Sequence, residues 1–528
     1  MTVINPLRTQ TKADLLFGVL QLLCVLATGA QVLIDYRYDN VISAAMVGLS
    51  TSALIQYLWR SGAAITHPVS SLALFGMCIT SQFASLLIQT FDGQPFVQLL
   101  RNPVLTFCVL AVVHAVGIIT HWAYRHLAAF QGLTQGIAKH VLSPLNVHAV
   151  PDTLTVWLLS LVGQYAFLSG QVEMGDSGGK FIAALAFLMW MPFLIPLYHK
   201  LYGEAYCSIK KQMPLILAYA FFIATVAIVK NFRQVMFIGP MQGVIIYFIY
   251  CLRDPTPVTL GTVKKLIAAV LGGLVLIWAV TDLATAMVLV RDKRDKASAR
   301  EMIEETIKAV ANKTEIKKYL EAKDLDAVVA LYDEAYLHNP VLARFSETKF
   351  HDNMLFYSDA LTDAQRTEIF ELSMLRTALL LPQDFLNALD VKLDKSKYIY
   401  SMGDVYINMN HGAEMGSFVT GSVWADMYAM SGVWFPFTCA LLFWFAYVVF
   451  DAMSRFDGRH FISPAALCTS WPIFIYGLGG ESFSAKVGLL IRDIPQRLLL
   501  YALCYALIGV LLAAFLPRYR RGLDLDGI

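Results

Sequence analysis

The segment from position 403 to 435 has the clearest potential for proton chemistry. It reads GDVYINMNHGAEMGSFVTGSVWADMYAMSGVWF. His411, Glu414 and Asp426 are candidate general acid–base residues, because an imidazole or a carboxylate can exchange a proton with a reacting hydroxyl. The alternative for His411 is a structural place in a connecting turn with the neighbouring Asn and Gly residues.

Cations beside apolar runs form a second group of candidates. Lys230 and Arg233 occur in KNFRQ between two apolar stretches, and Arg492 follows Glu481 and Lys486 in the segment 479–497. A cation is costly in a membrane, so its presence indicates function, and a guanidinium grips phosphate oxygens as a fork. We expect these cations to bind a diphosphate. The alternatives are snorkelling to the interface, pairing with a carboxylate, or a surface helix at lipid headgroups.

The chain that must position these residues has the composition of a membrane protein. Of its 528 residues, 57% are hydrophobic and 15% are charged, whereas soluble domains carry about 25% charged residues. The net charge of +2 gives no field that would favour nucleic acid. Spanning helices need about 20 apolar residues, which predicts about twelve of them, at 15–34, 41–59, 69–89, 104–122, 152–170, 181–198, 213–229, 235–252, 266–290, 433–450, 462–478 and 498–516.

The distribution of Lys and Arg orients these spans. With the N-terminus inside, the inner segments hold 16 Lys and Arg and the short outer segments hold 8. Short cytoplasmic loops carry the excess of positive charge. We therefore expect both termini in the cytoplasm.

The segment 291–415 differs from the rest of the chain. It contains 39 charged residues among 125, which predicts a soluble insert, placed by the topology outside the cytoplasm. Its periodicity is helical, and YLEAKDLDAVVALYDEAYLHNP (319–340) has the pattern of a single tetratricopeptide hairpin. Arg344, in VLARFSETKF, is a further candidate cation; the alternative is a solvated side chain.

The sequence thus predicts an all-α polytopic membrane protein in three parts. Residues 1–290 form a membrane domain with spans 1–9, residues 291–415 form the helical extracytoplasmic insert, and residues 416–528 contain the last three spans and a cytoplasmic tail. The stretch 416–450 is too long for one span and too short for two, so we expect a re-entrant or interfacial helix before a span.

Several catalytic signatures are absent from the sequence. There is no GxxxxGK[ST] phosphate loop, no HExxH pair and no CxxC motif. ATP-driven transport and zinc chemistry on this chain therefore have no support, and we predict no metal and no cofactor.

The layout resembles the Wzy-type oligosaccharide repeat-unit polymerases of bacterial cell-surface polysaccharides, which are related in plan to O-antigen ligases. The residues that carry the resemblance are Arg233, Arg344 with Phe345 and Ser346, the segment from Gly416 and Ser417 through Asp426, Tyr428 and Gly432, and Arg492. Asp426 replaces a Glu of the family pattern, and Ser431 replaces a Gly. These departures concern the subfamily more than the class.

The resemblance implies polymerisation of undecaprenyl-diphosphate-linked repeat units at the outer face of the bacterial cytoplasmic membrane. Lys230, Arg233, Arg344 and Arg492 would neutralise the leaving diphosphate, and His411, Glu414 and Asp426 would activate the acceptor hydroxyl. Sugar rings would be bound by Tyr406, Asn410, Trp424 and Tyr428. The implied partners are the lipid-linked oligosaccharide, membrane lipid, and a chain-length regulator or export complex.

Two other classes of protein remain open. A secondary transporter would depend on polar groups within spans, such as Asp282, although the matched helix breaks of internal repeats are missing. For Asp282 and His114, a polar contact between helices is the expected role. A non-catalytic component of a polysaccharide assembly complex would use the acidic insert to dock a partner.

Overall fold

The computed structural model describes residues 11–169, 177–254, 256–291, 298–326, 332, 336–381, 386–387, 390, 395–455 and 461–516. The described residues form helices and loops, with one antiparallel pair of two-residue strands, β1 (Ser454–Arg455) and β2 (Phe461–Ile462). The all-α membrane fold is thus confirmed. Residues 327–331 and 333–335 of the hairpin expected at 319–340, and the basic residues after position 517, lie outside the described part of the chain.

The first 289 residues supply most of the long apolar helices. They are α1 (Lys12–Ile34), α2 (Tyr38–Arg60), α3 (Ala63–Thr66), α4 (Pro68–Cys78), α5 (Ala84–Phe91), α6 (Pro103–His126), α7 (Ala128–Ile137), α8 (Thr153–Ser169), α9 (Ser177–Ala184), α10 (Ile195–Tyr202), α11 (Ile209–Val229), α12 (Arg233–Arg253) and α13 (Leu260–Leu289). A π-helical turn, Ile79–Phe83, joins α4 to α5, and a 3₁₀ segment, Leu185–Leu194, joins α9 to α10.

The rest of the chain contributes shorter helices and two further long ones. They are α14 (Ala299–Ala311), α15 (Lys313–Asp326), α16 (Thr348–Asp359), α17 (Asp363–Ala378), α19 (Met402–His411), α20 (Val423–Ser431), α21 (Phe435–Ala452), α22 (Pro464–Tyr476), α23 (Phe483–Gly488) and α24 (Ile494–Phe515). Gly432 separates α20 from α21 with a positive φ of 49°. The segment 416–450 therefore contains a short helix, a break and a long helix.

Nine helical stretches in the described residues are long and apolar enough to cross a membrane. Three of the twelve expected spans fall on shorter apolar stretches: α8, the part of α12 from Met241 to Arg253, and α22. At 1.5 Å per residue, the 13 residues of α22 extend about 20 Å, less than the roughly 30 Å of a bilayer core. The structure therefore shows a multi-pass membrane protein and does not establish twelve full spans.

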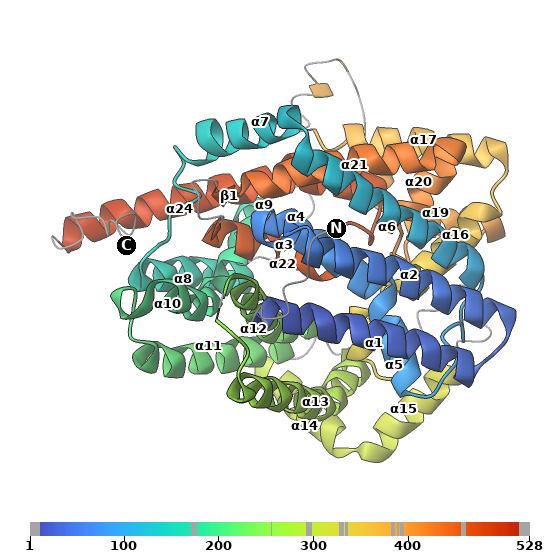
Figure 1. Cartoon of the computed structure of the whole chain (residues 1–528), viewed down its shortest axis with the longest axis horizontal. Helices are drawn as coiled ribbons and strands as arrows, with labels where there is room; N and C mark the ends of the chain where they lie inside the picture. The colour runs from blue at the N-terminus through green and yellow to red at the C-terminus, as the bar shows by residue number, and fades with distance from the viewer. Residues whose placement is uncertain are drawn as a thin grey trace, which may run out of the picture.

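Contacts between helix termini define two ends of the bundle. At one end, which we call the N-terminal end, the Trp59 indole donates to Asp14 at 2.8 Å and the Ser70 hydroxyl donates to Asp451 at 2.6 Å. At the other, the Asn40 amide donates to the backbone oxygen of Gln31 at 3.0 Å. Figure 1 shows α16, α17, α19 and α20 together at this second end, which we call the insert end, while the C-terminus of α24 lies at the opposite end.

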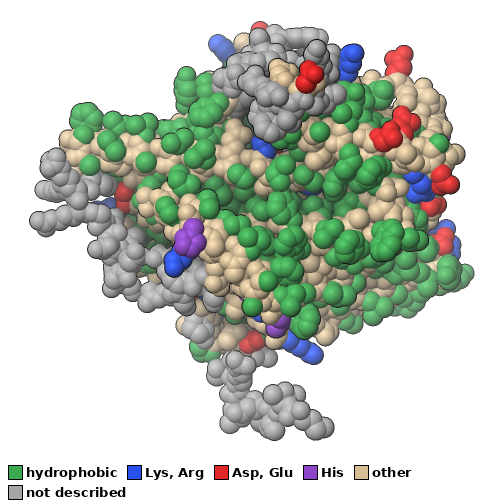
Figure 2. All heavy atoms as spheres, turned by 90° about the horizontal axis from the view of Figure 1, so that it is seen from above, with side chains coloured by type: hydrophobic (Ala, Val, Ile, Leu, Met, Phe, Trp, Pro, Cys, Tyr) green, Lys and Arg blue, Asp and Glu red, His purple; other side chains and the backbone are tan. Residues whose placement is uncertain are grey.

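The surface follows the same division. Figure 2 shows apolar side chains spread over the middle of one face, with charged side chains gathered along the right-hand edge, where the insert helices lie. Long helices such as α13 expose large apolar side chains, including Leu271 and Val275. A broad apolar belt with charge at its end is what a bilayer requires of a helical bundle.

Candidate functional site

Helix α16 carries the insert into the core of the bundle at the insert end. The Asp352 carboxylate is fully buried and accepts the backbone N–H of Arg101 at 2.7 Å and that of Asn102 at 3.0 Å. It also accepts the Thr106 hydroxyl at 3.1 Å. These groups begin α6, where the first N–H groups have no partner inside the helix and a negative charge is favourable. Asp352 thus fastens α16 to the start of α6.

The π-helical turn Ile79–Phe83 holds the other side of α16. A π turn displaces backbone carbonyls from the ordinary helical register. The Thr80 carbonyl accepts the Glu347 N–H, and the Ser81 carbonyl accepts the Thr348 hydroxyl, both at 2.7 Å. Ser85 adds a 2.6 Å hydroxyl contact to Thr348. The turn therefore fixes the position of Glu347 at the start of α16.

Glu347 and His351 form an acid–base pair one helical turn apart, in which His351 is fully buried and the Glu347 side chain is 12% exposed. Glu347 Oε2 lies 3.9 Å from His351 Nε2, and neither atom has a hydrogen-bond partner in the described part of the chain. On its other side, His351 Nδ1 shares a hydrogen bond of 2.8 Å with the Ser422 hydroxyl. The indole N–H of Trp424, which is fully buried, also lacks a partner among the described residues.

The Gly479–Gly480 backbone covers this pair. Ser422 and Gly480 form an antiparallel bridge, and the Val423 N–H donates to the Gly479 carbonyl at 3.0 Å. A Cβ atom on Gly479 would lie 2.9 Å from Trp424 Nε1 and 3.0 Å from His351 Nε2. A Cβ atom on Gly480 would lie 2.5 Å from Glu347 Oε1. Only residues without a side chain allow the backbone to pass so close to these polar groups.

Burial shifts the two members of the pair in opposite directions. It raises the pKa of Glu347 to about 7, although the nearby Lys486 ammonium opposes the shift. It lowers the pKa of His351 to about 3. At neutral pH the imidazole is therefore neutral, while the carboxyl is poised to gain or release a proton, as a general acid or base requires.

A lysine–carboxylate pair lies beside this site. Lys486 Nζ is 3.0 Å from Glu481 Oε2, and the Lys486 side chain is 11% exposed while that of Glu481 is 67% exposed. Both residues belong to the segment 479–497, for which an outer loop or a surface helix was expected. Most of this segment is helical instead: α23, a π turn (Leu489–Asp493) and α24 form one continuous stretch. The fold thus holds Lys486 on a rigid element.

Asp426 is buried close by and is tied to the same segment. One of its oxygens accepts the N–H of Phe483, the first residue of α23, at 2.8 Å. Its other oxygen and the hydroxyl of Tyr406 are both buried without hydrogen-bond partners among the described residues. The structure therefore brings together two of the predicted residues, Asp426 and Tyr406. Tyr406 and Trp424 are fully buried and expose no ring face.

His411 and Glu414 lie at the surface, just where α19 ends. The His411 ring contacts Tyr357 edge to face, with centroids 5.5 Å apart. The Asn410 amide donates to the carbonyls of Tyr406 at 2.8 Å and of Tyr357 at 3.3 Å. Asn410 thus stabilises the local backbone, while His411 and Glu414 remain accessible to a ligand.

An open groove of about 440 Å³ lies between α17 and α19. It is lined by two carboxylates, two tyrosines, an asparagine and apolar side chains: Glu368, Glu371, Leu372, Leu375, Tyr398, Tyr400, Val405, Asn408, Met409 and Met415. The Arg376 guanidinium supports the groove by donating to the carbonyl of Tyr398 at 3.0 Å and to that of Tyr400. Tyr428, outside the groove lining, donates to Asp359 at 3.3 Å.

Three of the four predicted diphosphate-binding cations, Lys230, Arg344 and Arg492, line neither of the two cavities described here. Lys230 donates to the carbonyls of Phe167 and Leu168 at the end of α8. Arg344 is exposed, and Arg492 is exposed and pairs with its neighbour Asp493 at 2.8 Å. Arg233 begins α12, and its side chain lies outside the described part of the structure.

Glu347 and His351, which the structure brings together beneath the Gly479–Gly480 backbone, were not predicted from the sequence. Their signal was weak: a Glu and a His spaced four apart, three positions after the selected Arg344, inside a charged insert. The Gly479–Gly480 pair was a second signal, because adjacent glycines favour close backbone approach. No motif links the two sites in the sequence.

The fold and this site together define a multi-pass helical membrane protein whose insert contributes a buried acid–base pair. No family model matches the chain, and no curated protein or solved structure is significantly similar to it.

Proposed function

We propose that the protein polymerises oligosaccharide repeat units carried on undecaprenyl diphosphate. In this reaction the bond between the anomeric carbon of the growing glycan and its diphosphate breaks. A new glycosidic bond forms to a hydroxyl of the next lipid-linked unit. The hydroxyl proton passes to a base, and undecaprenyl diphosphate leaves with the bonding electrons. This reaction requires one base and cations near the diphosphate, and it requires no metal or cofactor.

The observation that best supports this proposal is the buried pair of Glu347 and His351. A carboxyl whose pKa lies near 7 can accept a proton from a sugar hydroxyl at neutral pH. His351, neutral and hydrogen-bonded to Ser422, does not compete with Glu347 for this proton, because its pKa is lowered to about 3. We assign Glu347 as the base, and Asp426 a positioning role through its contact with α23. His411 and Glu414, at the exposed end of α19, would orient the acceptor.

The groove between α17 and α19 suits a carbohydrate. Tyrosine rings provide flat apolar faces, while carboxylates and amides hydrogen-bond hydroxyl groups. These groups come from side chains that line the groove: Tyr398, Tyr400, Glu371 and Asn408. It lies at the insert end, as the acid–base pair does, so a glycan bound there would approach from the same side of the bundle.

Lys486 is the cation best placed to act with Glu347. Its ammonium charge partly opposes the burial that raises the pKa of that carboxyl. We propose that Lys486, Arg492 and Arg344 neutralise the diphosphate at the insert end, with Lys230 and Arg233 supporting the lipid carrier. Cations near the leaving group stabilise the charge that develops on it.

The proposed location is the bacterial cytoplasmic membrane, with both termini inside and the insert end outside. Lys12, Lys200 and Lys265 lie at the end opposite the insert, in agreement with the excess of positive charge on cytoplasmic loops. A chain-length regulator or export complex would then meet the exposed helices of the insert.

The rival reading as a secondary transporter relied on Asp282. In the structure Asp282 forms an ion pair with Lys313 of α15 and is partly exposed. His114, the other polar residue within a span, is buried and bonds to Leu110 O at 2.6 Å and to Ser81 at 3.4 Å. Both residues make the polar contacts expected of them, and neither has the unpaired polar character of Glu347.

The proposal is tested in cells that lack the protein. Gels of their surface or secreted polysaccharide should show single repeat units in place of long chains. The wild-type gene should restore long chains, Glu347→Gln should not, and Glu304→Gln, an exposed carboxylate on α14, should behave as wild type. Equal membrane abundance of all three proteins is the control. Loss of every lipid-linked species in the deletion strain would contradict the proposal, because it would indicate an earlier step.

A further inference from the structure

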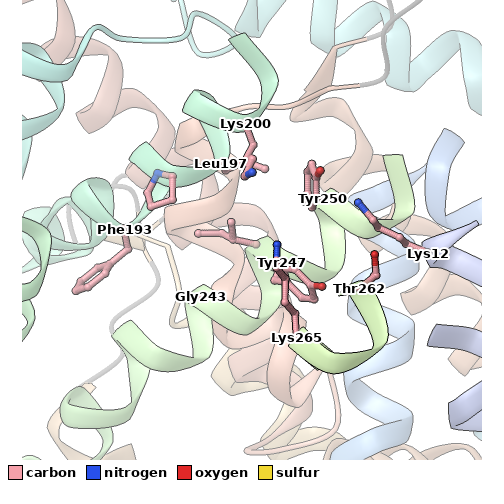
Figure 3. Close-up of a pocket in the computed structure, with 11 residues that line it drawn as sticks. Lys12, Phe193, Leu197, Lys200, Gly243, Tyr247, Tyr250, Thr262 and Lys265 are labelled. Carbon is pink, nitrogen blue, oxygen red and sulfur yellow. The ribbon is translucent and has the colours of Figure 1, made fainter. Parts of the chain in front are cut away.

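A second cavity, of about 370 Å³, lies at the N-terminal end of the bundle, away from the insert. Its walls come from α1, the 3₁₀ segment with α10, α12 and the start of α13. Figure 3 shows the side chains of Lys12, Lys200 and Lys265 around this cavity, with Tyr247 and Tyr250 between them. Three ammonium groups from distant parts of the chain thus converge on one hollow.

The charge of this cavity is positive. Lys12 forms an ion pair with Asp254, and Lys200 and Lys265 are exposed. Lys12 Nζ lies 5.1 Å and Lys200 Nζ 5.7 Å from the centre of the Tyr250 ring, so this one ring holds two like charges near each other. Two cations beyond the neutralised pair favour an anionic ligand, and the Thr262 hydroxyl adds a hydrogen-bond donor.

The rest of the cavity is lined mainly by apolar side chains, and exposed apolar side chains border it. Phe193, Leu197 and Ile246 line it. A Cβ atom on Gly243 would meet nothing within 4 Å, so this part of α12 borders open space. Nearby, Val244 and Ile267 are 62% and 54% exposed. A ligand that fits has an anionic head near the lysines and an apolar chain along α12 and α13.

We propose that this cavity binds the phosphate headgroup of an anionic phospholipid from the leaflet at the N-terminal end, with one acyl chain beside Gly243. Lysines beside an anionic membrane surface contribute to binding through the phosphate charge, and tyrosines lie well at the boundary between headgroup and chain. The inference does not rest on the proposed enzymatic function, because the cavity lies at the opposite end of the bundle.

The test uses the purified full-length chain in detergent, with lipid added at increasing concentration and binding followed by native mass spectrometry. The probes are phosphatidylglycerol, phosphatidylcholine and inorganic phosphate. Phosphatidylglycerol should bind to the wild type more tightly than phosphatidylcholine does. Lys200→Gln with Lys265→Gln should weaken binding of phosphatidylglycerol by about fivefold for each lysine, and Gly243→Leu should weaken it by filling the apolar part.

Lys264→Gln is the matched control, since Lys264 is an exposed neighbour on α13 that does not line the cavity. It should leave the affinity unchanged. The proposal is overturned if Lys264→Gln and the double variant lose the same affinity, or if Gly243→Leu binds phosphatidylglycerol as the wild type does. If inorganic phosphate competes fully with the lipid, the ligand is a free phosphate and the lipid assignment is wrong. Melting temperatures of all variants confirm that each is folded.

Discussion

Glu347 Oε2 and His351 Nε2 face each other across 3.9 Å inside the bundle, and a glycine backbone closes over both. The insert supplies both residues, whereas the glycines and Ser422 come from the last part of the chain. The pair is therefore covered only when the insert packs against the last part of the chain. Its chemistry and the docking of the insert depend on each other.

The opposite pKa shifts of this pair predict how stability depends on pH. Glu347 has a folded pKa of about 7 against an unfolded value of 4.5, so its contribution is lost as pH rises through this window. His351 has a folded pKa of about 3 against 6.5, so its contribution is lost as pH falls from 6.5 toward 3. Between pH 4.5 and 6.5 the two residues change the free energy of unfolding in opposite directions as pH rises.

Glu347→Gln removes the contribution of the Glu347 titration to the pH dependence of stability. From pH 5 to pH 8 the variant should gain about 2–3 kcal/mol of stability relative to the wild type. The measurement is the melting temperature of both proteins in detergent at each pH. Glu304→Gln should follow the wild type, and a difference between Glu347→Gln and wild type that stays constant with pH would show that Glu347 titrates normally.

Gly480→Ala tests the close approach of the backbone to Glu347. The added methyl would lie 2.5 Å from Glu347 Oε1, so the carboxyl or the bridge to Ser422 must shift, at a cost of about 1–3 kcal/mol. Polysaccharide chain length in complemented cells should fall together with the melting temperature. Gly272→Ala, in α13 with open space around it, should be neutral or slightly stabilising. Equal effects of the two changes would contradict this view of the site.

Asp352→Asn tests the attachment of α16 to α6. The change removes a buried charge that accepts three hydrogen bonds, and we expect a loss of about 2–4 kcal/mol. Lower melting temperature and faster proteolysis of the insert should appear together. Asp92→Asn, on an exposed turn, is the control. An unchanged rate of cleavage in the insert would argue against Asp352 as its anchor.

Arg492→Lys tests whether a guanidinium is needed at the insert end. Lysine keeps the charge and loses the fork that binds two phosphate oxygens, so we expect at least about a tenfold loss of polymerisation at unchanged abundance. Arg233→Lys should act in the same direction. Arg300→Lys, exposed on α14 and paired with Glu304, provides the comparison. Full activity of both Arg492→Lys and Arg233→Lys would remove these residues from the diphosphate site.

Hydropathy predicted much of the membrane fold, because long apolar runs have few other solutions in a bilayer. The α1, α2, α6, α11 and α13 helices enclose or overlap the expected spans. The length of the apolar run at 462–478 wrongly predicted a full span. The helix there, α22, contains Pro472 and has only 13 residues before its C-cap, Gly477. In this part of the chain, packing against α4 in the core, and not hydropathy, determines the length of the helix.

The site was less predictable than the fold. Composition placed 291–415 outside the membrane domain, yet α16 is buried, because its polar side chains find partners on α5, α6 and the π turn. Asp426 was selected for its place in a motif, and the structure gives it a backbone partner. Partners supplied from 250 residues away, as for Asp352, leave no local pattern in a sequence.

The most direct test of the central claim is reconstitution. Purified protein in lipid nanodiscs would be supplied with lipid-linked oligosaccharide extracted from the deletion strain, and the products separated by size. The wild type should give a ladder of longer glycans and release polyprenyl diphosphate in step with it, while Glu347→Gln should give neither. A wild-type protein that binds the lipid-linked unit but lengthens nothing, or a Glu347→Gln protein as active as the wild type, would contradict the assignment.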